Sequence, residues 1–241
     1  MIDLRLGDCL EVMKTIKDNS IDAIITDPPY GTTACKWDSV INFDLMWEQL
    51  NRIIKTNGAI VLFGNEPFSS ALRMSNIKNY KYDWVWDKLV GTGHAISKIQ
   101  PMRQVENIII FMNGSSFYYP IMEERNPKNI RVSGNSKNNS ITGMKKIAGV
   151  KSNKMEYPTN ILRHGGQSKE LNSKHRLHST QKPLDLMEYL IKTYTNKNET
   201  VLDFTMGSGT TMLACKNLNR NGIGIEKDPQ YYAVAVARVD G

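Results

Sequence analysis

The sequence predicts an α/β fold built on a mostly parallel, doubly wound sheet. Apolar, strand-like runs alternate with segments of helical periodicity along most of the 241 residues. This order is typical of a parallel sheet covered by helices on both faces. Two of the runs end in polar turns, at residues 27–30 and 205–210. Because open α/β sheets bind ligands at the carboxyl ends of their strands, these turns are candidates for a functional site.

The expected elements follow from the hydrophobic pattern. Strands are expected at about residues 22–26, 58–63, 80–87, 105–112, 199–204 and 222–226. Helices are expected at about residues 43–55, 67–76, 184–195, 208–219 and 229–238. Asp44 and Ser208 lie near helix starts, and Asn57-Gly58 is expected to end the first long helix. With 40% hydrophobic residues, a chain of this length can bury the core of one domain with an insertion.

The turn Asp27-Pro28-Pro29-Tyr30 places a carboxylate, a rigid backbone and an aromatic ring at the end of a strand. The Asp27 side chain and the Pro28 carbonyl are hydrogen-bond acceptors. They can hold the exocyclic amino group of a flat base and aim its lone pair at an electrophile, while Tyr30 stacks on the base. The prolines also suit a strand-terminating turn without chemistry. These four residues alone leave both interpretations open.

The turn Gly207-Ser208-Gly209-Thr210 lies between a short apolar strand and a helical pattern. Its two glycines allow the backbone to approach a ligand closely, and the start of the helix offers free N–H groups. Glu226 ends the next apolar strand. An acid about 20 residues beyond such glycines is placed to bind ribose hydroxyls. The spacing indicates a nucleotide-type cofactor site.

The two motifs, in this order, resemble the β group of amino-methylating DNA methyltransferases, which use S-adenosylmethionine. Further stretches are similar to elements of that family: Gly7-Asp8-Cys9-Leu10, Trp37-Asp38, Leu62-Phe63-Gly64 and the H-x-T-Q-K-P-like run at residues 178–183. The resemblance covers most of the chain except about residues 113–175. The chain departs from the family at Asp203-Phe204-Thr205, where relatives usually have Asp-Pro-Phe.

The resemblance implies a Rossmann-like methyltransferase fold with permuted motif order, and it also assigns residues to roles. Catalysis falls to Asp27, Pro28, Pro29 and Tyr30. Binding of S-adenosylmethionine falls to Asp8, Gln181, Lys182, Asp203, Gly207, Ser208, Gly209, Thr210 and Glu226. Lys182 also suits a surface charge beside Pro183 at a helix start, and Trp37 is placed to edge the base pocket.

The resemblance further implies the substrate. The Asp-Pro-Pro-Tyr form is found mostly in adenine enzymes, so N6 of adenine in duplex DNA is expected, methylated by direct displacement after the base is flipped out. Three alternatives stay open: N4 of cytosine, an amino group of RNA or of a protein glutamine, and a non-catalytic DNA-binding subunit of the same fold. A homodimer and a restriction endonuclease partner are also open.

Charge is concentrated in one segment of the chain. Residues 113–182 hold thirteen Lys or Arg against four Glu, a net +9, which leaves −2 for the remainder of a chain of total charge +7. Such a segment favours a polyanion partner, because neutralising phosphates is the main source of affinity for nucleic acid. We therefore expect residues 1–112 to form the catalytic half, 113–175 a target-recognition insertion, and 176–241 the cofactor-binding half.

Some functions are not expected from this sequence. No apolar segment approaches the roughly 20 residues of a transmembrane helix, and no signal peptide pattern opens the chain, so a soluble, cytoplasmic protein is expected. Cys9, Cys35 and Cys215 are odd in number and widely spaced, which is atypical of a disulfide framework or of metal-ligand pairs. No metal cofactor is expected.

Removing charge from the basic segment is predicted to weaken DNA binding. In a variant with Lys145, Lys146 and Lys151 all changed to Ala, the log–log slope of affinity against salt should fall by about 0.9 for each phosphate that is no longer neutralised. Fluorescence anisotropy with a labelled duplex at several salt concentrations measures the slope, and calorimetry with S-adenosylmethionine provides the control. A slope equal to that of the wild type would show that these lysines are ordinary surface charge.

Overall fold

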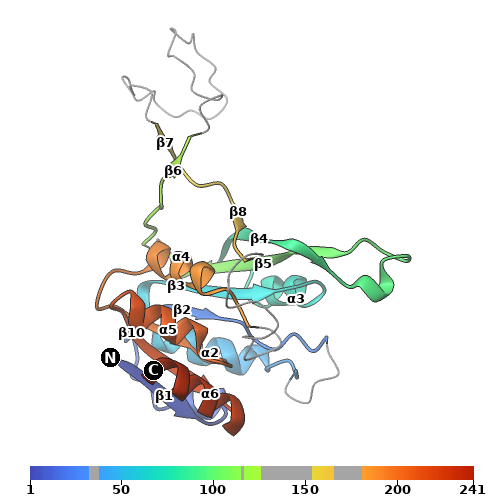
Figure 1. Ribbon diagram of the computed structural model, residues 1–241. Helices are drawn as coiled ribbons and strands as arrows, with labels where there is room; N and C mark the ends of the chain where they lie inside the picture. Colours follow the sequence, from blue (N-terminus) through green and yellow to red (C-terminus); the bar gives the residue numbers. More distant parts are fainter. Residues whose placement is uncertain (33–37, 115–116, 126–153, 166–180) are drawn as a thin grey trace. The chain divides into compact units, whose positions relative to one another are not determined.

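The computed structural model describes residues 1–32, 38–114, 117–125, 154–165 and 181–241 (Figure 1). The α/β fold with a mostly parallel sheet is confirmed. The chain divides into two compact units, one made of residues 1–119 with 160–241 and the other of residues 120–159. All the residues that the sequence places in the candidate site belong to the larger unit.

One eight-stranded sheet organises the described part of the larger unit, in the order β1-β10-β9-β2-β3-β5-β4-β8. Pairing is parallel from β1 to β3 and between β4 and β8, and antiparallel where β5 meets β3 and β4. The strands are β1 Ile2–Leu6, β2 Ile21–Thr26, β3 Ile54–Gly64, β4 Tyr80–Thr92, β5 Arg103–Met112, β8 Ile161–Arg163, β9 Thr200–Asp203 and β10 Asn221–Glu226. The central position of β2, between β9 and β3, decides where the site lies.

Three of the α-helices in the described residues begin at a side-chain cap. The helices are α1 Cys9–Met13, α2 Phe43–Ile53, α3 Phe68–Ser75, α4 Leu184–Tyr194, α5 Thr210–Asn217 and α6 Pro229–Asp240, with a 3-10 turn η1 at His94–Ile96. Side-chain oxygens of Asp8, Asn42 and Asp228 accept backbone N–H groups at the starts of α1, α2 and α6, which satisfies otherwise unpaired donors. In the described part of the chain, no helix is long and apolar enough to cross a membrane.

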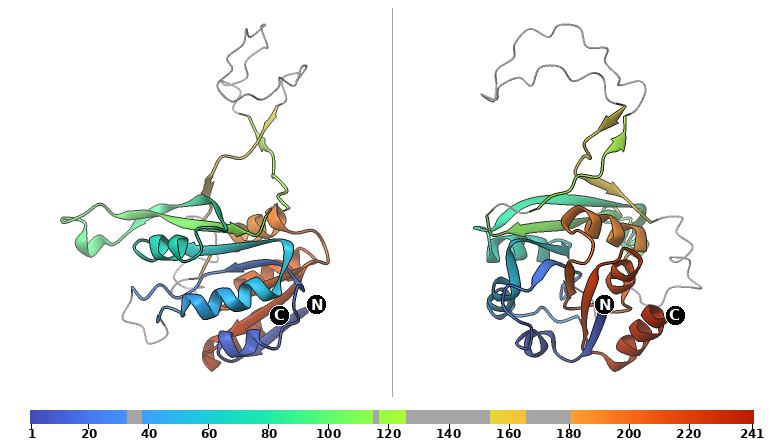
Figure 2. Two further views of the ribbon diagram at one scale, coloured as in Figure 1. Left: turned by 180° about the vertical axis from the view of Figure 1, so that it is seen from behind. Right: turned by 90° about the vertical axis from the view of Figure 1, so that its left-hand side faces the viewer.

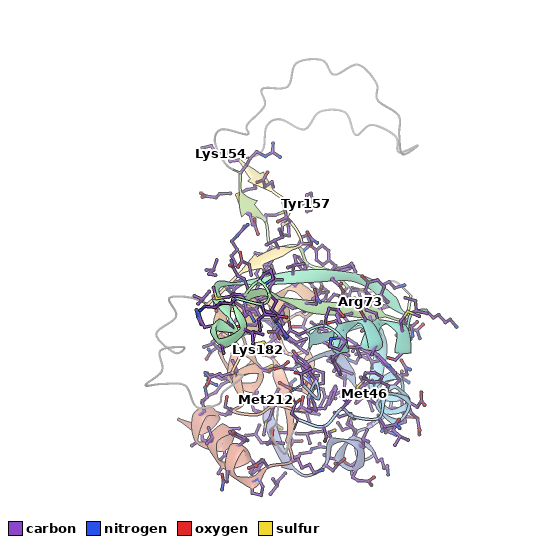
Figure 3. The ribbon with its side chains drawn as sticks, turned by 90° about the vertical axis from the view of Figure 1, so that its right-hand side faces the viewer. Met46, Arg73, Lys154, Tyr157, Lys182 and Met212 are labelled. Atoms are coloured by element: carbon purple, nitrogen blue, oxygen red, sulfur yellow. The ribbon has the colours of Figure 1, made fainter. Side chains whose placement is uncertain are left out.

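Successive side chains of β2 are buried on opposite faces of the sheet, which explains why this strand is almost wholly apolar. Ala23 and Ile25 pack in a cluster with residues of α4, α5 and α6, whereas Ile24 packs with residues of α1, α2 and α3. Met212 and Met46, labelled in Figure 3, belong to these two clusters, and Figure 2 shows helices on both sides of the sheet. With both faces covered, the strand ends remain for ligand binding.

One predicted boundary is wrong. Asn57-Gly58 does not end a helix, because α2 ends at Ile53 and β3 begins at Ile54 without a loop between them. The two residues lie where the register between β2 and β3 shifts. Glycine is required there, since a Cβ atom at Gly58 would come within 2.8 Å of the Asp22 carbonyl oxygen.

Two strands and one α-helix of the larger unit were not predicted from the sequence. The strand β1 is a half-buried edge strand and α1 has five residues, so neither has a strong hydrophobic pattern. The strand β8 pairs with β4, although it lies within residues 113–175. Part of the segment expected to be a target-recognition insertion thus completes the main sheet. That residues 113–175 recognise the target stays a prediction.

The smaller unit contains one described pair of strands, β6 Glu123–Glu124 and β7 Met155–Glu156, which are antiparallel. Arg125 follows β6, and its guanidinium lies 3.2 Å from the Glu156 carboxylate. Most of the basic segment, including Lys145, Lys146 and Lys151, lies outside the described residues.

Candidate active site

The ends of β2 and β9 bring the two sequence motifs together. Thr205 follows β9 and donates its hydroxyl to the backbone oxygen of Asp27 at 3.0 Å, across 178 residues of sequence. The hydroxyls of Thr26 and Thr205 lie 2.9 Å apart. The cause is topological, because β2 and β9 are parallel neighbours whose carboxyl ends meet at one edge of the sheet.

A cavity of about 580 Å³ lies at this edge, a volume in the usual range for small-molecule sites. Its lining includes all but one of the residues predicted for the site: Asp8, Asp27, Pro28, Pro29, Tyr30, Gln181, Lys182, Asp203, Gly207, Ser208, Thr210 and Glu226. The exception is Gly209, which has a φ of 76°. A Cβ atom there would come within 3.2 Å of the Ala235 Cα, so Gly209 lets α5 begin close against α6.

The Glu226 carboxylate ties the glycine turn to the end of β10. It accepts the backbone N–H of Gly207 at 2.9 Å and that of Asp228 at 2.8 Å. A carboxylate offers about four acceptor positions, so two remain for hydroxyl groups of a ligand. This spare capacity suits the ribose of a nucleotide-type cofactor.

Other residues predicted to bind the cofactor also have partners within the protein. Asp8 caps α1 and accepts the Lys227 ammonium at 3.0 Å. The Thr210 hydroxyl accepts a hydrogen bond from the Arg238 guanidinium at 2.7 Å, and Ser208 is bonded more loosely to the same group at 3.4 Å. These contacts fix the start of α5 against α6 beside the cavity.

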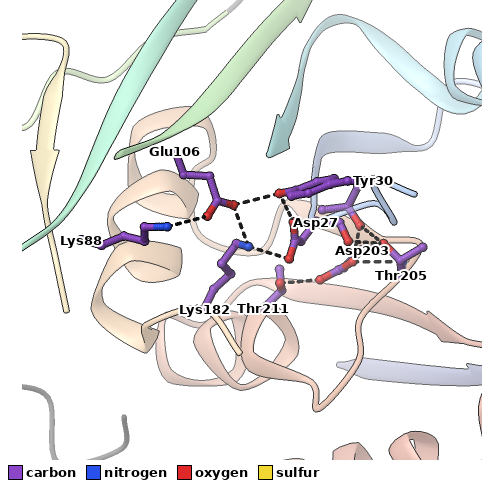
Figure 4. A network of polar contacts seen from close by, with 9 residues as sticks. Asp27, Tyr30, Lys88, Glu106, Lys182, Asp203, Thr205 and Thr211 are labelled. Carbon is purple, nitrogen blue, oxygen red and sulfur yellow. Dashed lines mark hydrogen bonds and ion pairs between the residues drawn. The ribbon is translucent and has the colours of Figure 1, made fainter. Parts of the chain in front are cut away.

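Asp203, at the end of β9, is a buried carboxylate held by three hydrogen bonds. The Thr26 and Thr211 hydroxyls donate to it at 2.5 Å each, and the Thr205 N–H donates at 3.1 Å. Burial raises the Asp203 pKa to about 6, against the opposing effect of these donors. Figure 4 shows that this cluster lies next to Asp27.

Lys182 joins the candidate catalytic carboxylate to a second acid. Its ammonium lies 2.6 Å from Asp27 Oδ2 and 2.9 Å from Glu106 Oε1 (Figure 4). Glu106 is on β5 and is 6% exposed. Lys182 precedes α4 and is 9% exposed, so it is not a surface charge. The family resemblance assigned Lys182 to the binding of S-adenosylmethionine, and the structure places its ammonium at Asp27.

The Tyr30 hydroxyl completes this network. It lies 2.5 Å from Asp27 Oδ1 and 2.8 Å from Glu106 Oε1. Its ring packs against Phe68, with centroids 5.0 Å apart and an interplanar angle of 31°. Asp38 fixes the turn beyond Tyr30 by accepting the N–H groups of Gly31 and Thr32 at 2.8 and 2.9 Å.

The charges of this network shift its pKa values in opposite directions. Burial raises the pKa of Asp27, and the Lys182 ammonium opposes that rise only in part. Burial also works to raise the pKa of Glu106, but the Lys182 ammonium, the Tyr30 hydroxyl and the Lys88 ammonium together outweigh it, so the Glu106 pKa is lowered. Burial lowers the affinity of Lys182 for its proton, yet the Asp27 and Glu106 carboxylates together raise its pKa above the ordinary value. Lys182 is therefore a cation at neutral pH.

Sequence reasoning missed Glu106 and the threonines at positions 26, 205 and 211. Glu106 had a visible signal, because it is the one acid of a strand that continues as the apolar run from Ile108 to Met112. The threonines had no such signal, since their partners come from strands distant in sequence.

Trp37, predicted to edge the base pocket, lies outside the described residues. In the part of the chain that is described, no group of three or more His, Cys, Asp or Glu is placed to hold a metal ion.

A doubly wound sheet with such a cavity at its carboxyl edge is typical of an α/β protein that binds a nucleotide-type cofactor. The particular family is found by comparison with known sequences. The model of the N6/N4 DNA methylase family matches residues 21–237, and the chain belongs to that family.

Curated relatives are type II methyltransferases. The chain is 29% identical over 254 residues to M.HpaI of Haemophilus parainfluenzae, a match that covers 99% of this chain and 75% of that protein. It is 28% identical over 247 residues to M1.MboII of Moraxella bovis, with 93% and 91% covered.

Solved structures of methyltransferases share the fold. The M1.HpyAVI complex with SAM, S-adenosylmethionine, is 29% identical and has a TM-score of 0.66, with all of both chains covered. The cytosine-N4-specific PvuII DNA methyltransferase is 18% identical and has a TM-score of 0.69, with 98% of this chain and 86% of that chain covered. The fold is therefore common to enzymes of different sequence.

The buried Asp203 carboxyl is predicted to make the unfolding free energy of the protein depend on pH. Its folded pKa of about 6 exceeds the ordinary value of 3.8, so between these values the folded chain holds a proton that the unfolded chain has released. The binding of this proton therefore adds to the unfolding free energy. That contribution is fully present below the unfolded pKa and is lost as the pH rises through the folded pKa. Between pH 4.5 and 7.5, the wild type should lose about 2 kcal/mol more unfolding free energy than Asp203→Asn.

Urea unfolding at the two pH values measures this difference. Asp44→Asn, which changes an exposed carboxylate on α2, is the matched control and should follow the wild type. Equal pH dependence in the wild type and Asp203→Asn would contradict the assigned protonation of Asp203.

Proposed function

We propose that this chain transfers a methyl group from S-adenosylmethionine to the N6 amino group of adenine in duplex DNA. The observation that carries the proposal is that both the Asp27–Tyr30 turn and the turn that contains Gly207 line the same cavity. The first has the chemistry to hold an amino group, and the second has the chemistry to hold a nucleotide-type cofactor. Membership of the DNA methylase family supports this pairing.

The lining residues suit S-adenosylmethionine, which supplies the methyl group when bound. Glu226 has spare acceptor capacity for ribose hydroxyls, because two backbone N–H groups use it among the described residues. The Gly207 backbone has a φ of 53° and lies at the cavity wall without a side chain, which allows close approach. Asp8 at the start of α1 and Gln181 before α4 complete the proposed binding set.

The chain's own residues act mainly by position and charge. The amino nitrogen of adenine is conjugated and poorly nucleophilic, and it gains positive charge as it is methylated. In the proposal, Asp27 and the Pro28 carbonyl accept its hydrogen atoms, and the Asp27 carboxylate stabilises the growing charge. Holding the nitrogen in line with the methyl donor contributes up to roughly 7–11 kcal/mol. Tyr30 offers a face for stacking, at about 1–3 kcal/mol for a base.

The choice of adenine rather than cytosine is supported by the Asp-Pro-Pro-Tyr form of the turn, which resembles the turn of adenine enzymes. The N4-cytosine alternative has support as well, because the cytosine-N4-specific PvuII enzyme has the same fold.

We also propose that the protein is cytoplasmic. A homodimer and a restriction endonuclease are the partners to be tested.

The proposal is tested by incubating the protein with tritiated S-adenosylmethionine and unmodified bacterial DNA. Hydrolysis and chromatography of the DNA should show label in N6-methyladenine. Label in N4-methylcytosine would change the assigned target base from adenine to cytosine and leave the proposed methyl transfer unchanged. If no DNA became labelled while the protein bound S-adenosylmethionine, the non-catalytic alternative would hold.

Asp27→Ala is predicted to separate chemistry from folding. The buried Lys182 ammonium keeps a partner in this variant, because Glu106 lies 2.9 Å away. The thermal transition and the affinity for S-adenosylmethionine should therefore stay close to those of the wild type, the affinity within a few-fold, while single-turnover transfer falls at least about 100-fold.

Glu226→Gln provides the opposite comparison and should weaken cofactor binding first, since one acceptor oxygen becomes a donor amide. Calorimetry and quenched single-turnover assays on the same preparations separate the two effects. Near-normal transfer by Asp27→Ala would make the Asp27 turn structural and move the reaction centre elsewhere.

A further inference from the structure

Glu106 is a buried acid that has no direct task in the proposed methyl transfer. It lies on β5, and its carboxylate contacts three polar groups: the Lys182 ammonium at 2.9 Å, the Tyr30 hydroxyl at 2.8 Å and the Lys88 ammonium at 3.8 Å. Glu106 is absent from the lining of the cavity. Any effect it has on a ligand must therefore pass through a neighbouring side chain.

The first such neighbour is Lys182. One ammonium serves two carboxylates, since its three N–H donors can reach both Asp27 Oδ2 and Glu106 Oε1. Attraction between opposite charges is strong where water is excluded. Lys182 bound to Asp27 alone would neutralise that carboxylate. Sharing the ammonium leaves part of the Asp27 charge free to act on a ligand.

The second neighbour is Tyr30. Its hydroxyl has one hydrogen atom but lies within hydrogen-bond distance of both carboxylates. It can therefore donate to Asp27 or to Glu106, and not to both at once. Donation to Glu106 frees the Asp27 oxygen that faces Tyr30. Both neighbours thus link the state of Glu106 to the acceptor strength of Asp27.

We propose that Glu106 is a positioning residue for the reaction at Asp27, and that it acts by sharing the Lys182 ammonium and the Tyr30 hydroxyl. The Asp27 carboxylate thereby keeps the negative charge that an amino group needs as it becomes positive. This inference rests on the proposed methyl transfer. It assigns a role in the reaction to a residue outside the cavity.

The charged groups around Asp27 and Glu106 determine how the rate of methyl transfer should depend on pH. Asp27 faces Lys182, Tyr30 and Glu106, and it also affects Asp203 of the neighbouring strand β9. Transfer requires ionised Asp27, so the rate falls at low pH as Asp27 gains a proton. The Glu106 charge helps to raise the Asp27 pKa. Removing that charge moves the acid limb of the rate profile to lower pH.

On its other side, Glu106 faces Lys88 of β4, and the Arg103 charge acts on Lys88 in turn. Lys88 is the group whose removal has the opposite effect. Without the Lys88 charge, Glu106 is less neutralised and acts more strongly on Asp27. The acid limb then moves to higher pH.

The test compares Glu106→Gln with the wild type in single-turnover methyl transfer at a series of pH values. The variant keeps the shape of the side chain and loses its charge. The plateau rate should fall about 10-fold, which corresponds to about 1.4 kcal/mol, and the acid limb should move to lower pH. Affinity for S-adenosylmethionine should stay within about two-fold, since Glu106 is outside the cavity. Glu48→Gln, an exposed acid on α2, is the matched control and should follow the wild type.

Two further variants complete the test. Lys88→Met should move the acid limb to higher pH, and Glu106→Asp, which keeps the charge, should restore the position of the limb. A rate profile of Glu106→Gln that superimposes on the wild type would overturn the inference while leaving the proposed function intact. If Glu106→Gln does not fold, an unmoved limb in Lys88→Met overturns the inference instead. Absence of transfer by the wild type on any DNA would refute the proposed function itself.

Discussion

The Lys182 ammonium between Asp27 and Glu106 is the interaction on which the candidate site depends. The Asp27 carboxylate, which follows β2, and the buried Glu106 carboxylate of β5 would repel each other without a cation between them. Leaving a buried charge unpaired is strongly destabilising. Lys182 precedes α4, so the pairing also ties the second half of the chain to the first. The ammonium lies 4.9 Å from the centre of the Phe63 ring and 5.8 Å from that of Trp86, and these aromatic faces stabilise it where water is excluded.

The sheet explains how distant motifs form one site. Because β2 lies between β9 and β3, the Asp27 turn meets the loop after β9, and Thr26, Thr205 and Asp203 join the two in one hydrogen-bonded cluster. Glu226, at the end of β10, then holds the glycine turn in place. The order of the motifs along the chain is thus unimportant for the chemistry. What matters is which strands are neighbours.

Much of the fold could be predicted from the sequence, because the central strands contain apolar runs and most of the helices have at least two turns. The short edge strand β1 and the strand β8 could not, since their apolar runs are brief and their stability comes from strands far along the chain. The lining residues of the cavity were largely predictable from the two motifs together with the family resemblance. The network was not, because the meeting of Glu106 with Lys182 depends on tertiary contacts that no local pattern encodes. Asn57-Gly58 was misjudged because a register shift has the same sequence signal as a turn.

The most direct test of the shared ammonium is the titration of the two carboxylates in the protein itself. Side-chain carboxyl carbons labelled with carbon-13 can be followed by NMR against pH, with Asp27→Asn and Glu106→Gln used to assign the two signals. We predict that Asp27 titrates above the ordinary aspartate pKa of 3.8, because burial and the Glu106 charge outweigh its share of the Lys182 ammonium. Glu106 should titrate below the ordinary glutamate pKa of 4.5, because its polar partners, Lys182 first among them, together outweigh burial. Titration of both groups at their ordinary values would show that Lys182 does not hold them together.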